Sequence, residues 1–223
     1  TRRRRTPLVV RRRSGRRLCG TGAIRARTAH GPGVPMHRFD VETLTAGRWK
    51  NGGGTTREIV SWPRGTEAFQ WRASVADIDG DGPFSAFPGV DRTLTLLAGD
   101  GVRLTAAGGF DRTTRPEEPL AFAGDLELAA ALRGGPCRVL NLMVRRDRWT
   151  ARVRRITGPV VPPPGHAGVL LVLRGRWWSG DAAAPLEAGQ GVWWDGEEGA
   201  PGGAFEPLAP GAAALWADVA PVR

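Results

Sequence analysis

Short apolar runs separated by glycine, proline and aspartate make up the chain from residue 36 onward. Residues 69–75 alternate strictly, with Phe69, Trp71, Ala73 and Val75 on one side and polar residues on the other. No stretch longer than a turn or two repeats with the 3.6-residue period of a helix. Further strand-length runs lie at 92–97, 102–105, 137–145, 169–173, 192–194 and 214–219. The pattern predicts an all-β, antiparallel protein.

The turn signals between these runs predict how the strands are grouped. Gly99-Asp100-Gly101 joins runs 92–97 and 102–105, and Asp-Gly between apolar runs predicts a hairpin. A Pro-Leu segment ending in Gly-Asp at 119–125 follows this hairpin, and a similar segment ending in Gly-Gln at 185–190 follows the run at 169–178. This repetition predicts two related antiparallel barrels or jelly rolls, at 36–146 and 147–223.

The formal net charge of +10 is concentrated at the start of the chain. Residues 1–35 contain eleven arginines and no acidic residue, whereas the rest holds 21 basic and 22 acidic residues. Globular patterning begins at Met36, so we interpret residues 1–35 as a disordered extension that precedes the true start. A nucleic-acid arm and a targeting peptide are the alternatives for such a segment. We expect no nucleic-acid partner for the body.

Apolar runs and cysteines indicate the compartment. The run at 8–10 is too short for a signal-peptide core, and the run at 167–173 is too short to span a bilayer. Cys137 is the single cysteine after residue 36, which excludes an internal disulfide there. We expect a cytoplasmic protein without a membrane partner, and the oligomeric state stays open, with a dimer as one option.

From residue 36 onward the sequence lacks the residues that several common binding and catalytic sites need. His37 and His166 are the only histidines from residue 36 onward, too few for the usual transition-metal sets. Asp77 begins a calcium-like loop, but Pro88 stands where the loop needs its bidentate glutamate. No nucleophile elbow is present, and no pattern pairs Cys137 with a histidine and an acid. We therefore predict no metal and no cofactor.

Residues 49–58, WKNGGGTTRE, read as a binding site. Three glycines free the backbone to bring bare N–H groups close to a ligand, and Arg57 offers a two-point fork for a carboxylate. The phosphate-binding motifs do not match, because no Lys-Ser/Thr follows the glycines. A glycine-rich hairpin loop before a strand explains the same residues without a ligand. Glu58 fits a structural ion pair with an arginine better than a general base.

Four separated motifs occur in the order found in a known family: residues 49–59, the pair Trp71-Arg72, residues 81–92 (DGPFSAFPGVDR) and residues 141–143 (NLM). Together they resemble the HutD/Ves family. The resemblance implies a double-barrelled cupin (bicupin) fold, with a pocket drawn mainly from the first barrel. It also implies a link to histidine utilisation, in which a HutD-type protein binds a small acidic catabolite and restrains the pathway. Most cupins hold a metal through His and Glu, and this chain lacks those histidines.

We therefore expect a metal-free protein that binds a small carboxylate, such as a formylated or formiminated glutamate, as a sensor or governor of histidine utilisation. Arg57 and Arg72 would hold carboxylates. The alternative is a metal-independent cupin enzyme, such as a sugar epimerase or isomerase, with Glu58 or Lys50 as base. The expected ligand-binding residues are Trp49, Lys50, Asn51, Gly52, Gly53, Gly54, Thr55, Thr56, Arg57, Glu58, Arg72, Ser74, Phe84, Ser85, Phe87, Asp91, Arg92 and Asn141.

Overall fold

The computed structural model describes residues 35–66, 68–180, 184–197 and 201–222, and within these ranges the regular structure is β apart from one 3₁₀ turn. The expected disordered extension at 1–35 lies almost entirely outside the described residues. The turn is η1 (Val41–Thr43). The strands are β1 (His37–Asp40), β2 (Ala46–Arg48), β3 (Gly54–Trp62), β4 (Trp71–Ile78), β5 (Gly82–Phe84), β6 (Val90–Ala98), β7 (Val102–Ala106), β8 (Phe110–Thr113), β9 (Pro119–Ala123), β10 (Leu128–Leu132), β11 (Cys137–Arg145), β12 (Trp149–Ile156), β13 (Ala167–Arg174), β14 (Trp177–Trp178), β15 (Gln190–Trp194), β16 (Glu206–Pro207) and β17 (Ala213–Pro221).

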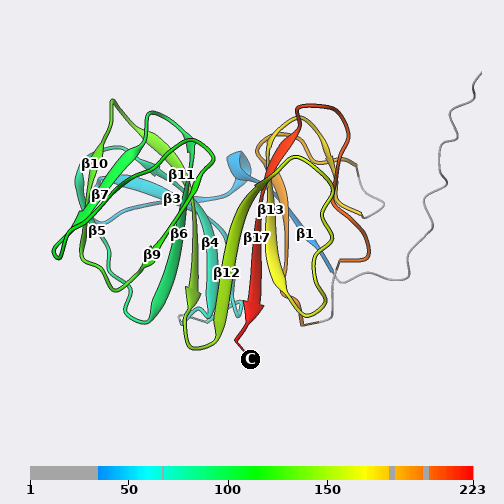
Figure 1. The fold of residues 1–223 in the computed structure, drawn as a ribbon, viewed down its shortest axis with the longest axis horizontal. Helices are drawn as coiled ribbons and strands as arrows, with labels where there is room; N and C mark the ends of the chain where they lie inside the picture. Colours follow the sequence, from blue (N-terminus) through cyan, green and yellow to red (C-terminus); the bar gives the residue numbers. More distant parts are fainter. Residues whose placement is uncertain (1–34, 67, 181–183, 198–200, 223) are drawn as a thin grey trace, which may run out of the picture.

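The strands form stacked sheets, with the largest in the centre (Figure 1). The central sheet has the order β2-β3-β4-β11-β6-β9. A four-stranded sheet, β5-β10-β7-β8, faces it on one side, and a five-stranded sheet, β1-β15-β13-β17-β12, faces it on the other. The strands within each sheet pair antiparallel, as the residue pattern predicts. The all-β expectation is confirmed.

Alternation along the central strands fills two hydrophobic layers. Trp71, Ala73 and Val75 of β4 join the core shared with the five-stranded sheet. Residues on the opposite face, such as Ala76 and Ile78, join the core shared with the four-stranded sheet. A third core lies on the far face of the five-stranded sheet. Because side chains in a strand alternate between faces, each large sheet contributes to two layers.

The hairpin expected at 92–105 does not form. Gly99 and Gly101 do adopt positive φ, at 91° and 106°. However, β6 pairs with β9 and β11 in the central sheet, whereas β7 pairs with β8 and β10 in the facing sheet. The turn therefore passes the chain between layers. The physical reason is that β11 and β9 already occupy the two edges of β6, so β7 has no free edge there to pair with.

The expected division at residue 146 falls in the turn between β11 and β12. Strand β1 belongs to the first half of the sequence but pairs with β15 of the second half, in the five-stranded sheet. The described sheets have open strand orders, and none closes on itself. The double-barrelled arrangement and its two domains thus stay a prediction.

Glu117 forms an ion-pair cluster that links the two halves. Its carboxylate accepts hydrogen bonds from Arg174 at 2.5 and 2.9 Å and from Nε of Arg155. Arg155 lies on β12 and Arg174 ends β13, so both belong to the five-stranded sheet. Glu117 itself precedes β9 of the central sheet and has φ of 60°. A non-glycine residue in this conformation is held there by its surroundings.

Candidate functional site

A cavity of about 750 Å³ opens on the side of the central sheet that faces the four-stranded sheet. Its floor comes from alternate residues of β3, β4, β11 and β6, and its walls come from the β2 segment, the loop after it, and β5 with the residues that follow. The residues that line it are Thr45, Gly47, Arg48, Trp49, Lys50, Asn51, Thr56, Glu58, Arg72, Ser74, Ala76, Pro83, Phe84, Ser85, Phe87, Arg92, Leu94, Val139, Asn141 and Met143.

Sheet register places two arginines on either side of β11. Met143 of β11 is aligned with Arg72 of β4 and with Arg92 of β6. Neighbouring strands lie about 4.8 Å apart, so the two Cα atoms are roughly 10 Å from one another across the cavity floor. The positive charge of Arg72 acts unfavourably on that of Arg92, and a negatively charged group between them would relieve the repulsion.

Arg92 is a buried cation without a carboxylate partner among the described residues. Its side chain and backbone together are only 5% exposed. NH1 donates to the carbonyl of Ser85 at 2.9 Å and NH2 donates to Oδ1 of Asn141 at 3.2 Å, while the buried Nε has no acceptor. Burial, with the positive charge of Arg72 second, lowers the pKa of Arg92 to about 10. An uncompensated buried charge of this kind is costly unless a ligand supplies the counter-ion.

Arg72 differs from Arg92 because it already has a carboxylate partner. Its Nε donates to Oε2 of Glu58 at 2.8 Å. The ion pair expected for Glu58 is therefore present, and its partner is Arg72 on the neighbouring strand rather than Arg57. Both side chains line the cavity. A catalytic role for Glu58 stays a prediction.

The glycine segment does not form the expected anion nest. The amide of Gly52 donates to the carbonyl of Trp49 at 3.0 Å, and that of Gly53 donates to the side chain of Asn51 at 3.1 Å, so both are used within the loop. Gly54 is required for close packing, since a Cβ there would lie 2.3 Å from the carbonyl of Asp77. None of the three glycines lines the cavity, whereas Trp49 and Asn51 do.

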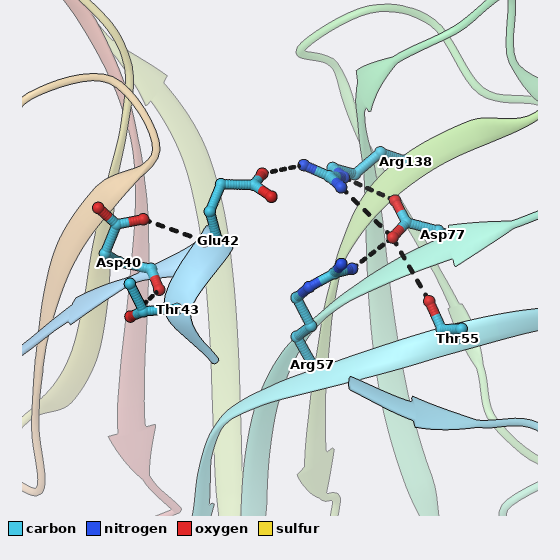
Figure 2. A network of polar contacts seen from close by, with 7 residues as sticks. All are labelled: Asp40, Glu42, Thr43, Thr55, Arg57, Asp77 and Arg138. Atoms are coloured by element: carbon cyan, nitrogen blue, oxygen red, sulfur yellow. Dashed lines mark hydrogen bonds and ion pairs between the residues drawn. The ribbon is translucent and has the colours of Figure 1, made fainter. Parts of the chain in front are cut away.

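Arg57 is also not among the cavity-lining residues, and its side chain points toward Asp77 instead (Figure 2). Thr55 and Arg57 alternate with Thr56 and Glu58 along β3, so they project from the opposite face. There Arg57 is paired with Asp77 of β4. Asp91, the remaining expected residue outside the cavity, pairs with Arg146 at 2.8 Å near the surface.

The structure thus brings together twelve of the expected residues: Trp49, Lys50, Asn51, Thr56, Glu58, Arg72, Ser74, Phe84, Ser85, Phe87, Arg92 and Asn141. Sequence reasoning missed other lining residues. Ala76, Leu94, Val139 and Met143 lie two positions from expected residues on the same strands, so strand alternation was the signal that could have found them. Arg48 had no such signal, because β2 is an exposed three-residue strand.

The cavity lining does not fit a transition metal. Glu58 is its single carboxylate, and it holds neither histidine nor cysteine. Elsewhere in the described part of the chain, no three His, Cys, Asp or Glu side chains gather as metal ligands would. None of the described helices is long and apolar enough to cross a membrane.

The stacked antiparallel sheets with a cavity between two of them form a cupin-like fold, which solved structures share. The Cupin 2 conserved barrel domain protein from Leptotrichia buccalis superposes with a TM-score of 0.52 at 10% identity, over 83% of this chain and 96% of the other. At that identity the similarity concerns the fold alone.

The family model of HutD matches residues 41–215, and the chain belongs to the HutD family. Protein Ves of Citrobacter koseri is 42% identical over 155 residues, which are 69% of this chain and 81% of Ves. HutD from Pseudomonas fluorescens SBW25, in its formate condition, superposes with a TM-score of 0.73 at 26% identity, over 85% of this chain and all of the other. The resemblance to the HutD/Ves family is confirmed.

Proposed function

We propose that the cavity binds a small carboxylate metabolite and that Arg92 is its main anion contact. The observation that carries this proposal is the burial of the Arg92 guanidinium with no carboxylate beside it and with Nε lacking an acceptor. Hydrogen bonds to Ser85 and Asn141 fix the guanidinium, so little side-chain entropy is lost when an anion binds. A planar carboxylate matches the N–H fork in two-point geometry.

A second carboxylate on the ligand would meet further cations of the cavity. Arg72 uses only Nε on Glu58, and Arg48 and Lys50 are exposed residues of the lining. Together with Arg92 these cations outnumber the single acid. The surplus of positive charge supports a formylated or formiminated glutamate, which carries two carboxylates.

Membership of the HutD family supports a link to histidine utilisation. We propose that the protein acts as a sensor or governor of that pathway by binding one of its intermediates. The three hydrophobic cores also support a bicupin description, with the second and third cores as the interiors of the two barrels.

The test is calorimetric titration with histidine-pathway intermediates after a thermal-shift screen. Arg92→Lys keeps the charge but loses the fork, so we expect affinity to fall by about 1–3 kcal/mol. Arg57→Lys is the matched control, because the same change is made on the reverse face of the sheet. Equal affinity in the wild type and Arg92→Lys, or a loss confined to Arg57→Lys, would overturn the proposal.

A further inference from the structure

Three phenylalanine rings enclose the Arg92 guanidinium. Its Cζ lies 4.6 Å from the ring centre of Phe84 and 5.3 Å from those of Phe87 and Phe122. Phe84 and Phe87 line the cavity, but Phe122 does not. Phe122 is aligned with Arg92 on the neighbouring strand β9 and is buried. It therefore contacts Arg92 from the neighbouring strand without lining the cavity.

This enclosure restricts what can reach the cation. Aromatic rings occupy positions over the guanidinium that water would otherwise take, and they stabilise its charge through their π faces. Two of its N–H groups are engaged by Ser85 and Asn141. The remaining N–H groups, including Nε, point in the plane of the guanidinium. An anion must therefore enter in that plane, and it must lose its own water to do so.

The charge of the entering group then determines the free energy of binding at Arg92. One carboxylate neutralises Arg92, whereas a phosphate or phosphonate dianion leaves one negative charge in a dehydrated place. Arg72 shares its charge with Glu58, which pairs with it at 2.8 Å, so it can meet a separate carboxylate of the ligand but does not fully offset a second negative charge held at Arg92. The desolvation cost of an ion rises with the square of its charge, while its attraction to Arg92 rises only in proportion.

We infer that the aromatic enclosure of Arg92 makes the cavity select a carboxylate over a phosphate or phosphonate group, and that Phe122 is a residue that sets this specificity. The inference rests on the proposed function, because it concerns the same cavity. Because Phe122 contacts Arg92 and does not line the cavity, it is a positioning residue.

The experiment compares two probes with one anionic group each, butyrate and propylphosphonate, at a pH at which the phosphonate is a dianion. A single anionic group prevents either probe from binding in reverse. Affinities are measured by NMR titration for the wild type, Phe122→Met and Phe110→Leu. Phe122→Met keeps much of the volume but removes the ring. Phe110→Leu is the control, because the Phe110 ring packs against Phe122 at 6.2 Å, and the arginine whose Cζ lies over it is Arg112 rather than Arg92.

We expect the wild type to prefer butyrate, and Phe122→Met to reduce the ratio of the two affinities about tenfold. Phe110→Leu should lower stability and leave the ratio unchanged. If Phe122→Met does not fold, Phe122→Leu takes its place. Butyrate binding that depends on Arg92, combined with an unchanged ratio in the folded Phe122 variant, refutes this inference alone. Butyrate binding that is absent or indifferent to Arg92→Lys refutes the proposed function as well.

Discussion

Arg57 should stabilise the fold without taking part in ligand binding. Its guanidinium donates to Oδ2 of Asp77, and Nε of Arg138 donates to Oδ1 of the same carboxylate at 2.6 Å. NH1 of Arg138 in turn donates to Oε1 of Glu42 (Figure 2). Glu42 lies in η1, the turn that connects the five-stranded sheet to the central one. Arg57→Met removes one of two cations around a carboxylate that is only 23% exposed.

A hydrogen bond to a charged group contributes about 1.5–3 kcal/mol when buried. This pair is partly exposed, so we expect Arg57→Met to cost about 1–2 kcal/mol. Burial by itself raises the pKa of Asp77, but the hydrogen bonds from Arg138 and Arg57 outweigh it, and the net pKa is lowered from 3.8. The stabilisation is therefore present above this ordinary value and is lost as the pH falls through the lowered one.

The assay is urea unfolding of the wild type, Arg57→Met, Asp77→Asn and the double variant, at neutral pH and again below pH 3.8. The double-mutant cycle should give a coupling free energy of about 1 kcal/mol at neutral pH, and less in acid. Calorimetry on the same variants should show unchanged ligand affinity for Arg57→Met. A coupling free energy near zero would refute the network, and a tenfold loss of affinity without loss of stability would return Arg57 to the binding site.

Three further predictions concern other parts of the fold. Glu117→Gln should destabilise the protein by about 1–2 kcal/mol at neutral pH. Burial raises the pKa of Glu117, but the hydrogen bonds from Arg174 and Arg155 outweigh this effect and lower the pKa from 4.5. The difference in urea stability should therefore vanish in acid, and a difference that stays constant with pH would contradict the prediction. Gly191→Ala should cost at least about 3 kcal/mol, because the new Cβ would lie 2.3 Å from the carbonyl of Leu170; a melting temperature within a degree of the wild type would contradict it. Burial raises the pKa of Cys137 to about 11, so its thiol should react with Ellman's reagent only on unfolding, and rapid reaction of the native protein would contradict it.

Strand alternation predicted the all-β class and the two faces of β4. Trp71 and Val75 are in a core, and Arg72 and Ser74 face the cavity, as residues 69–75 indicated. Tandem tryptophans followed the same rule, since Trp193 and Trp194 lie in different cores. Pairing was not predictable in the same way: the glycines at 99 and 101 fixed a turn but carried no information about which sheet the next strand joins.

The cavity floor could be predicted in part because family motifs and alternation agree at β4, β6 and β11. At β3 they do not suffice. Thr55 and Arg57 on one face and Thr56 and Glu58 on the other are all polar, so the hydrophobic pattern gives no reason to choose between faces. The charged fork of Arg57 favoured the face opposite to the cavity. Only the pairing with Asp77 across the sheet decides the question.

Arg92 shows why the chemistry of the site depends on contacts distant in sequence. In the sequence it is one arginine among many, within a motif shared with the HutD family. The Phe122 ring packs against its guanidinium, and Asn141, which lies 49 residues away, accepts one of its hydrogen bonds. A buried arginine with no carboxylate beside it is suited to bind an anion. Whether a carboxylate lies beside it depends on the residues of all the strands that surround it. The reverse face of the same sheet makes the contrast, because there each arginine of the network meets an acid (Figure 2). The two faces therefore differ in role: paired charges on one face hold the halves of the fold together, and on the other face Arg92 keeps the unpaired charge that we propose for a ligand.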